Sequence, residues 1–87
     1  MAKVQVEIKD MAFNPATVSI KAGDCVCWTN NDSMAHTVTD DAAAKRKAVD
    51  SGKIEVGASY ERTYATAGSF PYHCEYHSGM NGCVEVS

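Results

Sequence analysis

The sequence predicts an all-β fold, either a β-sandwich or a small barrel, and two observations lead to this prediction. First, about seven short segments alternate apolar and polar residues, and turn-forming residues separate them. Second, the chain has 87 residues, which is the size of one small domain with a single core. We therefore expect residues 1–87 to form one domain.

Three strands are expected in the first third of the chain. Residues 4–9 and 17–21 are apolar at every second position, which is the pattern of a half-buried strand. An Asn-Pro pair within residues 10–16 predicts a turn or an irregular stretch between these two strands. Residues 25–30 are rich in strand-forming side chains and predict the third strand, in which Val26 and Trp28 share the apolar face.

The rest of the chain predicts four more strands. They are expected over residues 35–39, 59–64, 70–74 and 82–86, where β-branched and aromatic residues recur between turn signals. Residues 41–48 are different, because several helix formers follow an acidic start. We expect one or two helical turns there.

The composition restricts the classes of function. Eleven Asp and Glu residues against 8 Lys and Arg residues give a formal net charge of −3, which offers no electrostatic basis for general nucleic-acid binding. No apolar run approaches the ~20 residues of a transmembrane helix. The N-terminus lacks the pattern of a signal peptide, so if the protein is exported we expect this sequence to be the mature form. We therefore expect no nucleic-acid partner and no membrane span.

One short motif carries the chemistry. Cys74, His77 and Met80 follow one another at intervals of three residues between two expected strands, and His36 lies far upstream near the start of another strand. A thiolate, two imidazoles and a weak axial thioether are the ligands of electron-transfer copper sites, because thiolate and thioether suit Cu(I) and imidazole suits both oxidation states. The pattern predicts a mononuclear copper site.

Other metal sites fit the sequence less well. A structural zinc site would use Cys and His without a thioether, so Met80 argues against it. A trinuclear oxidase cluster needs more histidines than the three in this chain, and His73 precedes Cys74 on a strand and should point to the opposite face. We therefore expect no enzymatic activity. A copper-binding or storage module with the same ligands but no electron-transfer role remains as an alternative.

The chain resembles the cupredoxins, the small type 1 blue copper proteins, over nearly its whole length. The similarity is greatest to the amicyanin and plastocyanin branch, and the short interval between His77 and Met80 is the amicyanin-like form of the ligand loop. The segments that carry the resemblance are Phe13-Asn14-Pro15, Gly23-Asp24 with Val26, Trp28 and Asn30, Ser33 to Val38, Asp50-Ser51-Gly52, and Gly68 to Cys74 continuing to Gly82.

The resemblance implies a fold and a site. The fold is an all-β Greek-key β-sandwich of about seven to eight strands with the metal at one end. The copper ligands are His36, Cys74, His77 and Met80, and backbone N–H groups near Thr37 should hydrogen-bond the Cys74 sulfur. The function implied is electron transfer by one copper ion that cycles between Cu(II) and Cu(I) in the periplasm or outside the cell. Redox partner proteins are expected to dock transiently near the exposed edge of His77.

Three further cysteines are unusual for this pattern. Alternation places Cys25 and Cys27 opposite Val26 and Trp28, so both thiols should face solvent, and Cys83 should do the same on the last strand. They could be introduced surface thiols on an engineered scaffold, a second soft-metal site formed by Cys25 and Cys27, or sites of intermolecular disulfides. We expect a monomer that can form disulfide-linked dimers through these thiols.

Overall fold

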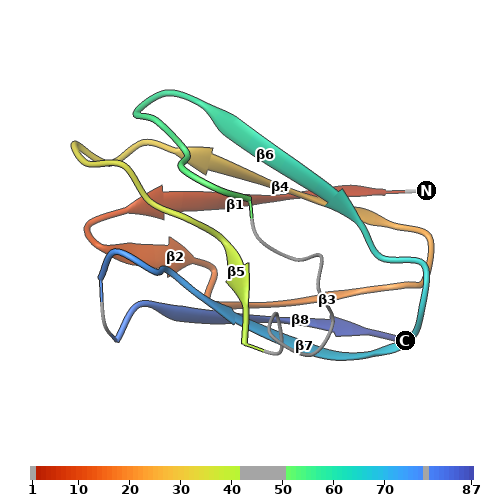
Figure 1. Ribbon diagram of the computed structural model, residues 1–87. Coiled ribbons are helices and arrows are strands. Elements are labelled where there is room, and N and C mark those ends of the chain that lie inside the picture. Colours follow the sequence, from red (N-terminus) through yellow and green to blue (C-terminus); the bar gives the residue numbers. More distant parts are fainter. Residues whose placement is uncertain (1, 42–50, 78) are drawn as a thin grey trace.

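The alternating segments of the sequence form eight strands in the computed structural model, which describes residues 2–41, 51–77 and 79–87. The strands pack as two layers, and no helix is present among the described residues (Figure 1). The strands are β1 Lys3–Lys9, β2 Ala12–Asn14, β3 Thr17–Ile20, β4 Cys25–Asn30, β5 Thr39–Asp40, β6 Ser59–Thr63, β7 Gly68–His73 and β8 Asn81–Val86.

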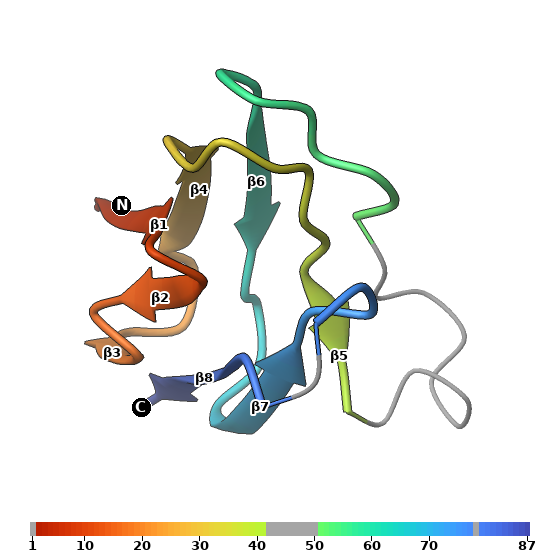
Figure 2. The ribbon, with the colours of Figure 1, turned by 90° about the vertical axis from the view of Figure 1, so that its left-hand side faces the viewer.

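Each sheet contains four strands, in the orders β2-β1-β4-β6 and β3-β8-β7-β5. Neighbours in a sheet are often distant in sequence, because β1 pairs in parallel with β4 and β3 pairs in parallel with β8. The connections therefore cross repeatedly from one sheet to the other, and Figure 2 shows the two layers end-on. This arrangement confirms the predicted all-β sandwich of seven to eight strands.

Alternation explains the core between the sheets. Val6 and Ile8 of β1 and Val26 and Trp28 of β4 are fully buried. The alternate residues of β1, such as Gln5 and Glu7, are exposed. Tyr72 of β7 meets Trp28 edge-on, with ring centroids 5.4 Å apart. Burial of these large apolar side chains is the main source of stability in a domain of this size.

Strand β2 was not predicted, because three residues are too few to show a period. A two-residue turn at Asp10 and Met11 reverses the chain and pairs β2 with the end of β1. Both turn residues have positive φ angles, 54° and 59°, as a tight hairpin requires. The pairing buries Phe13, whose ring lies 4.7 Å from the ring of Tyr72.

The strand expected over residues 35–39 is largely wrong. His36 forms a single bridge with Ile54, and the regular pairing of β5 with β7 begins only at Thr39. In this segment the chain leaves one sheet and joins the other, and the Thr37 N–H bonds to the Cys74 sulfur instead of entering a ladder. The helical turns expected over residues 41–48 fall outside the described residues, apart from Asp41.

Cys27 is only 6% exposed, so the prediction that all three extra thiols face solvent is wrong for this residue. Strand β4 is an inner strand, and its outer face is covered from both sides. Gln5 of β1 and Glu61 of β6 lie opposite Cys27 in the two ladders, and directly opposed residues on one face are close neighbours. Cys25, the first residue of β4, and Cys83 of β8 stay partly exposed, and all four cysteines are free thiols.

This burial predicts how the thiols react. In the reduced protein we expect Cys25 and Cys83 to react with a bulky maleimide without denaturant, and Cys27 to react much more slowly. Burial raises the pKa of the Cys83 thiol, which should slow its reaction. Mass spectrometry of partly labelled protein measures this order. Labelling of Cys27 as fast as Cys25 would contradict the buried position.

Candidate metal centre

Two of the predicted site residues meet where the sheets come together. Cys74 follows β7 directly, and His36 lies in the crossover after β4, where its backbone exchanges hydrogen bonds of 2.7 and 3.2 Å with Ile54. The His36 Nδ1 atom lies 3.6 Å from the Cys74 Sγ atom. Both side chains are buried, at 0% and 3% exposure, so water has little access to either donor atom.

The loop between β7 and β8 brings the other two predicted residues to the same end. The ligand atoms of His36, Cys74 and His77 all lie within 4.8 Å of one another, and His77 is partly exposed. The Cys74 N–H donates to the Met80 carbonyl at 3.0 Å, which closes the loop and holds Met80 beside Cys74 in the buried interior. This end of the sandwich faces the viewer in Figure 2.

The Cys74 sulfur receives the hydrogen bond that the resemblance implied. The Thr37 N–H donates to Sγ at 3.4 Å. The Thr37 hydroxyl accepts a 2.8 Å bond from the Glu75 N–H and lies 3.1 Å from the Thr39 hydroxyl. The same residue therefore contacts the sulfur and anchors the chain just after Cys74. A hydrogen bond of this kind draws electron density from the sulfur.

Sequence reasoning missed Asp32, which contacts the buried histidine. The Asp32 Oδ2 atom lies 2.9 Å from His36 Nε2 and also accepts a 3.0 Å bond from the Met11 N–H, while Oδ1 accepts a 2.8 Å bond from the Ser33 N–H. These two backbone bonds, and then the bond to His36, hold the pKa of the Asp32 carboxyl below its usual range. An acidic residue four positions before a histidine in a loop is too common a pattern to have revealed this contact.

Buried Asn30 shapes the loop that carries Asp32. Its amide Nδ2 donates to the Met34 carbonyl at 2.9 Å and to the Ile54 carbonyl at 3.0 Å, and its Oδ1 accepts the Asp32 N–H at 2.9 Å. Asn30 is 0% exposed, so each of these polar groups must be paired inside the protein. The three bonds position the segment from residue 31 to His36 against residue 54.

His73 lies outside the cluster, as its strand position predicted. Its two ring nitrogens contact carboxylates instead: Nδ1 pairs with Asp41, and Nε2 lies 2.7 Å from a carboxylate oxygen of Glu75. The bond to Asp41 is the main cause that raises the pKa of His73. Both ring nitrogens are therefore engaged by Asp41 and Glu75, and His73 offers no donor to the cluster.

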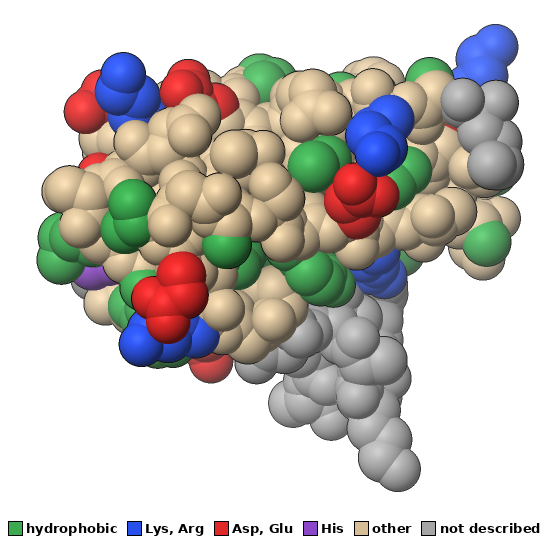
Figure 3. Space-filling model, turned by 90° about the horizontal axis from the view of Figure 1, so that it is seen from above, with side chains coloured by type: hydrophobic (Ala, Val, Ile, Leu, Met, Phe, Trp, Pro, Cys, Tyr) green, Lys and Arg blue, Asp and Glu red, His purple; other side chains and the backbone are tan. Residues whose placement is uncertain are grey.

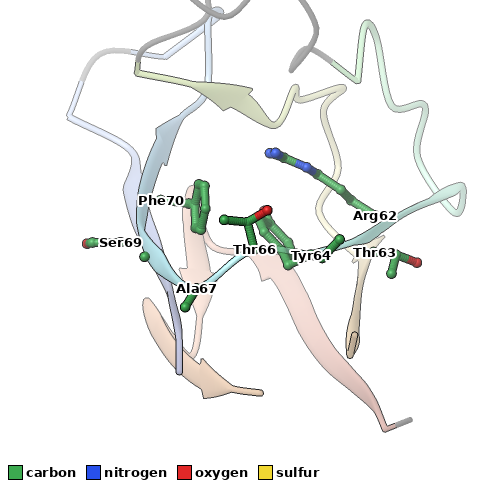
Figure 4. Close-up of a pocket in the computed structure, with 9 residues that line it drawn as sticks. Arg62, Thr63, Tyr64, Thr66, Ala67, Ser69 and Phe70 are labelled. Atoms are coloured by element: carbon green, nitrogen blue, oxygen red, sulfur yellow. The ribbon is translucent and has the colours of Figure 1, made fainter. Parts of the chain in front are cut away.

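A surface hollow of about 430 Å³ lies elsewhere, around the connection from β6 to β7 (Figure 4). Arg62 crosses it, with its guanidinium 4.3 Å from the centre of the Tyr64 ring and 5.8 Å from that of Phe70. The same guanidinium lies 3.7 Å from a carboxylate oxygen of Asp40. The hollow contains none of the predicted ligands, and Arg62 serves there to join β6 to the opposite sheet.

The donor set fits copper. A cysteine sulfur and two imidazole nitrogens converge within 4.8 Å. Met80, which carries a thioether, is buried, and its carbonyl accepts the Cys74 N–H. Thiolate and imidazole donors with a weak thioether suit copper in both of its common oxidation states, whereas carboxylate-poor sites of this kind do not suit Mg²⁺ or Ca²⁺. Among the described residues this is the single cluster of three or more such donors.

Comparisons with known proteins agree with this chemistry. A family model described as copper binding proteins, plastocyanin/azurin family, matches residues 1–87. The chain is 40% identical over 85 residues to a chloroplastic plastocyanin from Tetradesmus obliquus, covering 87% of this chain and 59% of that protein. It is 34% identical over 85 residues to a plastocyanin from Scenedesmus fuscus, with 87% of each chain covered. It is 32% identical over 84 residues to amicyanin from Paracoccus denitrificans, covering 95% of this chain and 64% of that one.

Solved structures have the same fold. The reduced Cu(I) form of an amicyanin mutant superposes with a TM-score of 0.89 at 30% identity, covering 97% of this chain and 81% of that chain. A purple cupredoxin from Nitrosopumilus maritimus gives a TM-score of 0.87 at 24% identity, covering 97% and 99%, which shows a common fold. The resemblance to cupredoxins is confirmed: the chain belongs to the plastocyanin/azurin family of copper-binding proteins.

Proposed function

We propose that this protein is an electron carrier that holds one copper ion between His36, Cys74, His77 and Met80. The observation that carries the proposal is the convergence of Cys74 Sγ and the two imidazoles at one end of the sandwich, in a chain of the copper-binding family. When bound, copper supplies a reversible one-electron couple between Cu(II) and Cu(I). We also propose that residues 1–87 act as a single domain.

The protein contributes a rigid and mostly dry site. Cys74 would be the strong anionic donor, with the Thr37 N–H drawing charge from its sulfur, and His36 would be held by Ile54 and Asp32. Met80 would supply the weak thioether. Because Cys74, His36 and Met80 are buried and tied to the sheets, the donors have little freedom to rearrange when an electron arrives or leaves, which favours rapid transfer.

Electrons would enter and leave through His77, which is partly exposed. Four large apolar side chains are exposed in the described residues, and all of them lie in loops at this end: Met11 at 43%, Met34 at 48%, Val56 at 57% and Tyr76 at 52%. We propose that a redox partner docks transiently on this apolar surface, since exposed apolar patches mark interaction sites. Figure 3 shows acidic and basic side chains lying close together on the face seen from above. Among the ion pairs of the described residues, Lys3 Nζ lies 2.9 Å from a carboxylate oxygen of Glu61.

No bond is made or broken in this function, so the protein acts as a carrier and not as an enzyme. We propose that it works as a monomer in the periplasm or outside the cell, as the resemblance to amicyanin implies. None of the described residues belongs to a helix with the length and apolar character to cross a membrane.

Voltammetry of the copper-loaded protein tests the carrier function. We expect a fast, reversible one-electron wave, and we expect Met80→Gln to lower the reduction potential while copper stays bound, because an amide oxygen stabilises Cu(I) less than a thioether does. Met34→Gln is the matched control. Because Met34 is an exposed methionine at the same end, the reduction potential of this variant should stay close to that of the parent protein. Tight copper binding with slow or irreversible electron exchange would indicate a storage module instead.

A further inference from the structure

We propose that Asp32 is a positioning residue for the copper site: its carboxylate sets the tautomer and orientation of His36 and shifts the preference of the site toward Cu(II). The proposal rests on the proposed function, because it assigns Asp32 a role toward the same four ligands. It concerns a residue that the ligand pattern does not contain.

The geometry decides which nitrogen of His36 is free. Asp32 Oδ2 lies 2.9 Å from Nε2, and a carboxylate can only accept, so Nε2 must carry the proton in this contact. The opposite nitrogen, Nδ1, faces Cys74 Sγ at 3.6 Å. His36 is 0% exposed and the Asp32 side chain 12%, so water has little access to the imidazole ring. The lone pair of Nδ1 is therefore directed at the place where the metal would bind.

Asp32 is itself held in place. Its two carboxylate oxygens accept the N–H groups of Met11 and Ser33, at 3.0 and 2.8 Å, and its own N–H donates to Asn30 at 2.9 Å. Met11 belongs to the β1–β2 turn and Asn30 to the end of β4, and these three strands belong to the same sheet. A carboxylate fixed from three directions can fix the imidazole in turn, as partners of metal-ligating histidines commonly do.

The charge of Asp32 adds an energetic effect. A carboxylate that accepts the second N–H of a ligating imidazole makes that imidazole a stronger donor, and removal of such a partner typically costs ~10–100-fold in metal affinity. The negative charge stabilises the ion of higher charge more, so Cu(II) benefits more than Cu(I). A tenfold loss of this preference corresponds to a rise of ~59 mV in a one-electron reduction potential.

Asp32→Asn tests this effect on the copper-loaded protein. Asparagine keeps the size and an acceptor oxygen but removes the charge. The matched control is Asp10→Asn, which removes a charge in the exposed neighbouring turn, without a contact to His36 and at a position where asparagine tolerates the positive φ. We expect a higher potential and at least tenfold weaker Cu(II) binding for Asp32→Asn, with little change in either quantity for Asp10→Asn. Equal potentials in the two variants would overturn the proposal.

The tautomer gives a second measurement that needs no variant. Nitrogen NMR of the parent protein in its metal-free or Cu(I) form should show His36 protonated at Nε2, with slow exchange of that proton. A proton on Nδ1 in the metal-free form would overturn the proposal even if Asp32→Asn failed to fold. Failure of the proposed function looks different: the parent protein itself would then show no intense thiolate-to-Cu(II) absorption.

Discussion

Replacement of Cys74 by alanine is expected to abolish the intense visible absorption that the protein should give with Cu(II). Such a band requires a thiolate bound directly to the metal, and Cys74 is the only cysteine in the cluster with His36 and His77. The other three cysteines lie on strands, Cys25 and Cys27 on β4 and Cys83 on β8, and none of them belongs to this group of donors. Titration of the variant with Cu(II), followed by visible spectroscopy, measures the loss.

Cys83→Ala is the matched control for this experiment. Cys83 is a partly exposed thiol on β8, where it contacts Ser69 and Glu85 and none of the proposed ligands. Its replacement should leave the band unchanged in position and intensity. A Cys74→Ala protein that kept an intense band would show that another thiol binds the metal, and the ligand assignment would then be wrong.

Replacement of Gly82 by alanine is expected to destabilise the metal-free protein by about 3 kcal/mol, at the upper end of the range for overpacked cores. Gly82 of β8 lies opposite Tyr72 of β7, and a Cβ atom at this position would overlap the Tyr72 ring. Tyr72 cannot move aside easily, because Phe13 and Trp28 both pack edge-on against it, at 4.7 and 5.4 Å between ring centroids. The Tyr72 ring fills the space that a side chain at position 82 would need.

Thermal unfolding without metal measures this effect. For a domain of this size, ~3 kcal/mol corresponds to a fall of ~12–24 °C in Tm. Asn81→Ala, at the exposed preceding position of the same strand, is the control and should change the stability by less than ~0.5 kcal/mol. A Gly82→Ala protein as stable as this control would mean that Tyr72 has room to shift.

The strands that sequence reasoning found are those with a visible period. β1, β3, β4, β6, β7 and β8 were all predicted to within about two residues, since each is long enough for alternation to show. β2 has three residues and depends on the turn at Asp10 and Met11. Both turn residues adopt positive φ angles although neither is glycine, so the sequence does not predict this turn. The burial of Cys27 depends on neighbours in two other strands, and a single strand's alternation carries no information about them.

The candidate site was predictable to the same extent. The spacing of Cys74, His77 and Met80 could be read from the sequence because all three come from one hairpin loop. His36 could be added by its residue type and by the family resemblance. Asp32 could not, because its contact with His36 arises from a fold in the loop that Asn30 holds with three hydrogen bonds. Local spacing predicts donors, while their supporting partners emerge only from the packed structure.

The proposed ligands come from two places in the chain, and this separates the length of the ligand loop from the pairing of the sheets. Three of the proposed ligands lie in the short connection between β7 and β8, whose ends are fixed by the pairing of His73 with Asn81. Insertions or deletions inside this connection alter the spacing of the metal environment without shifting the register of either sheet. A change in the length of this connection should therefore act on the metal environment and the partner surface, while the pairing of both sheets and the position of the upstream histidine stay as they are.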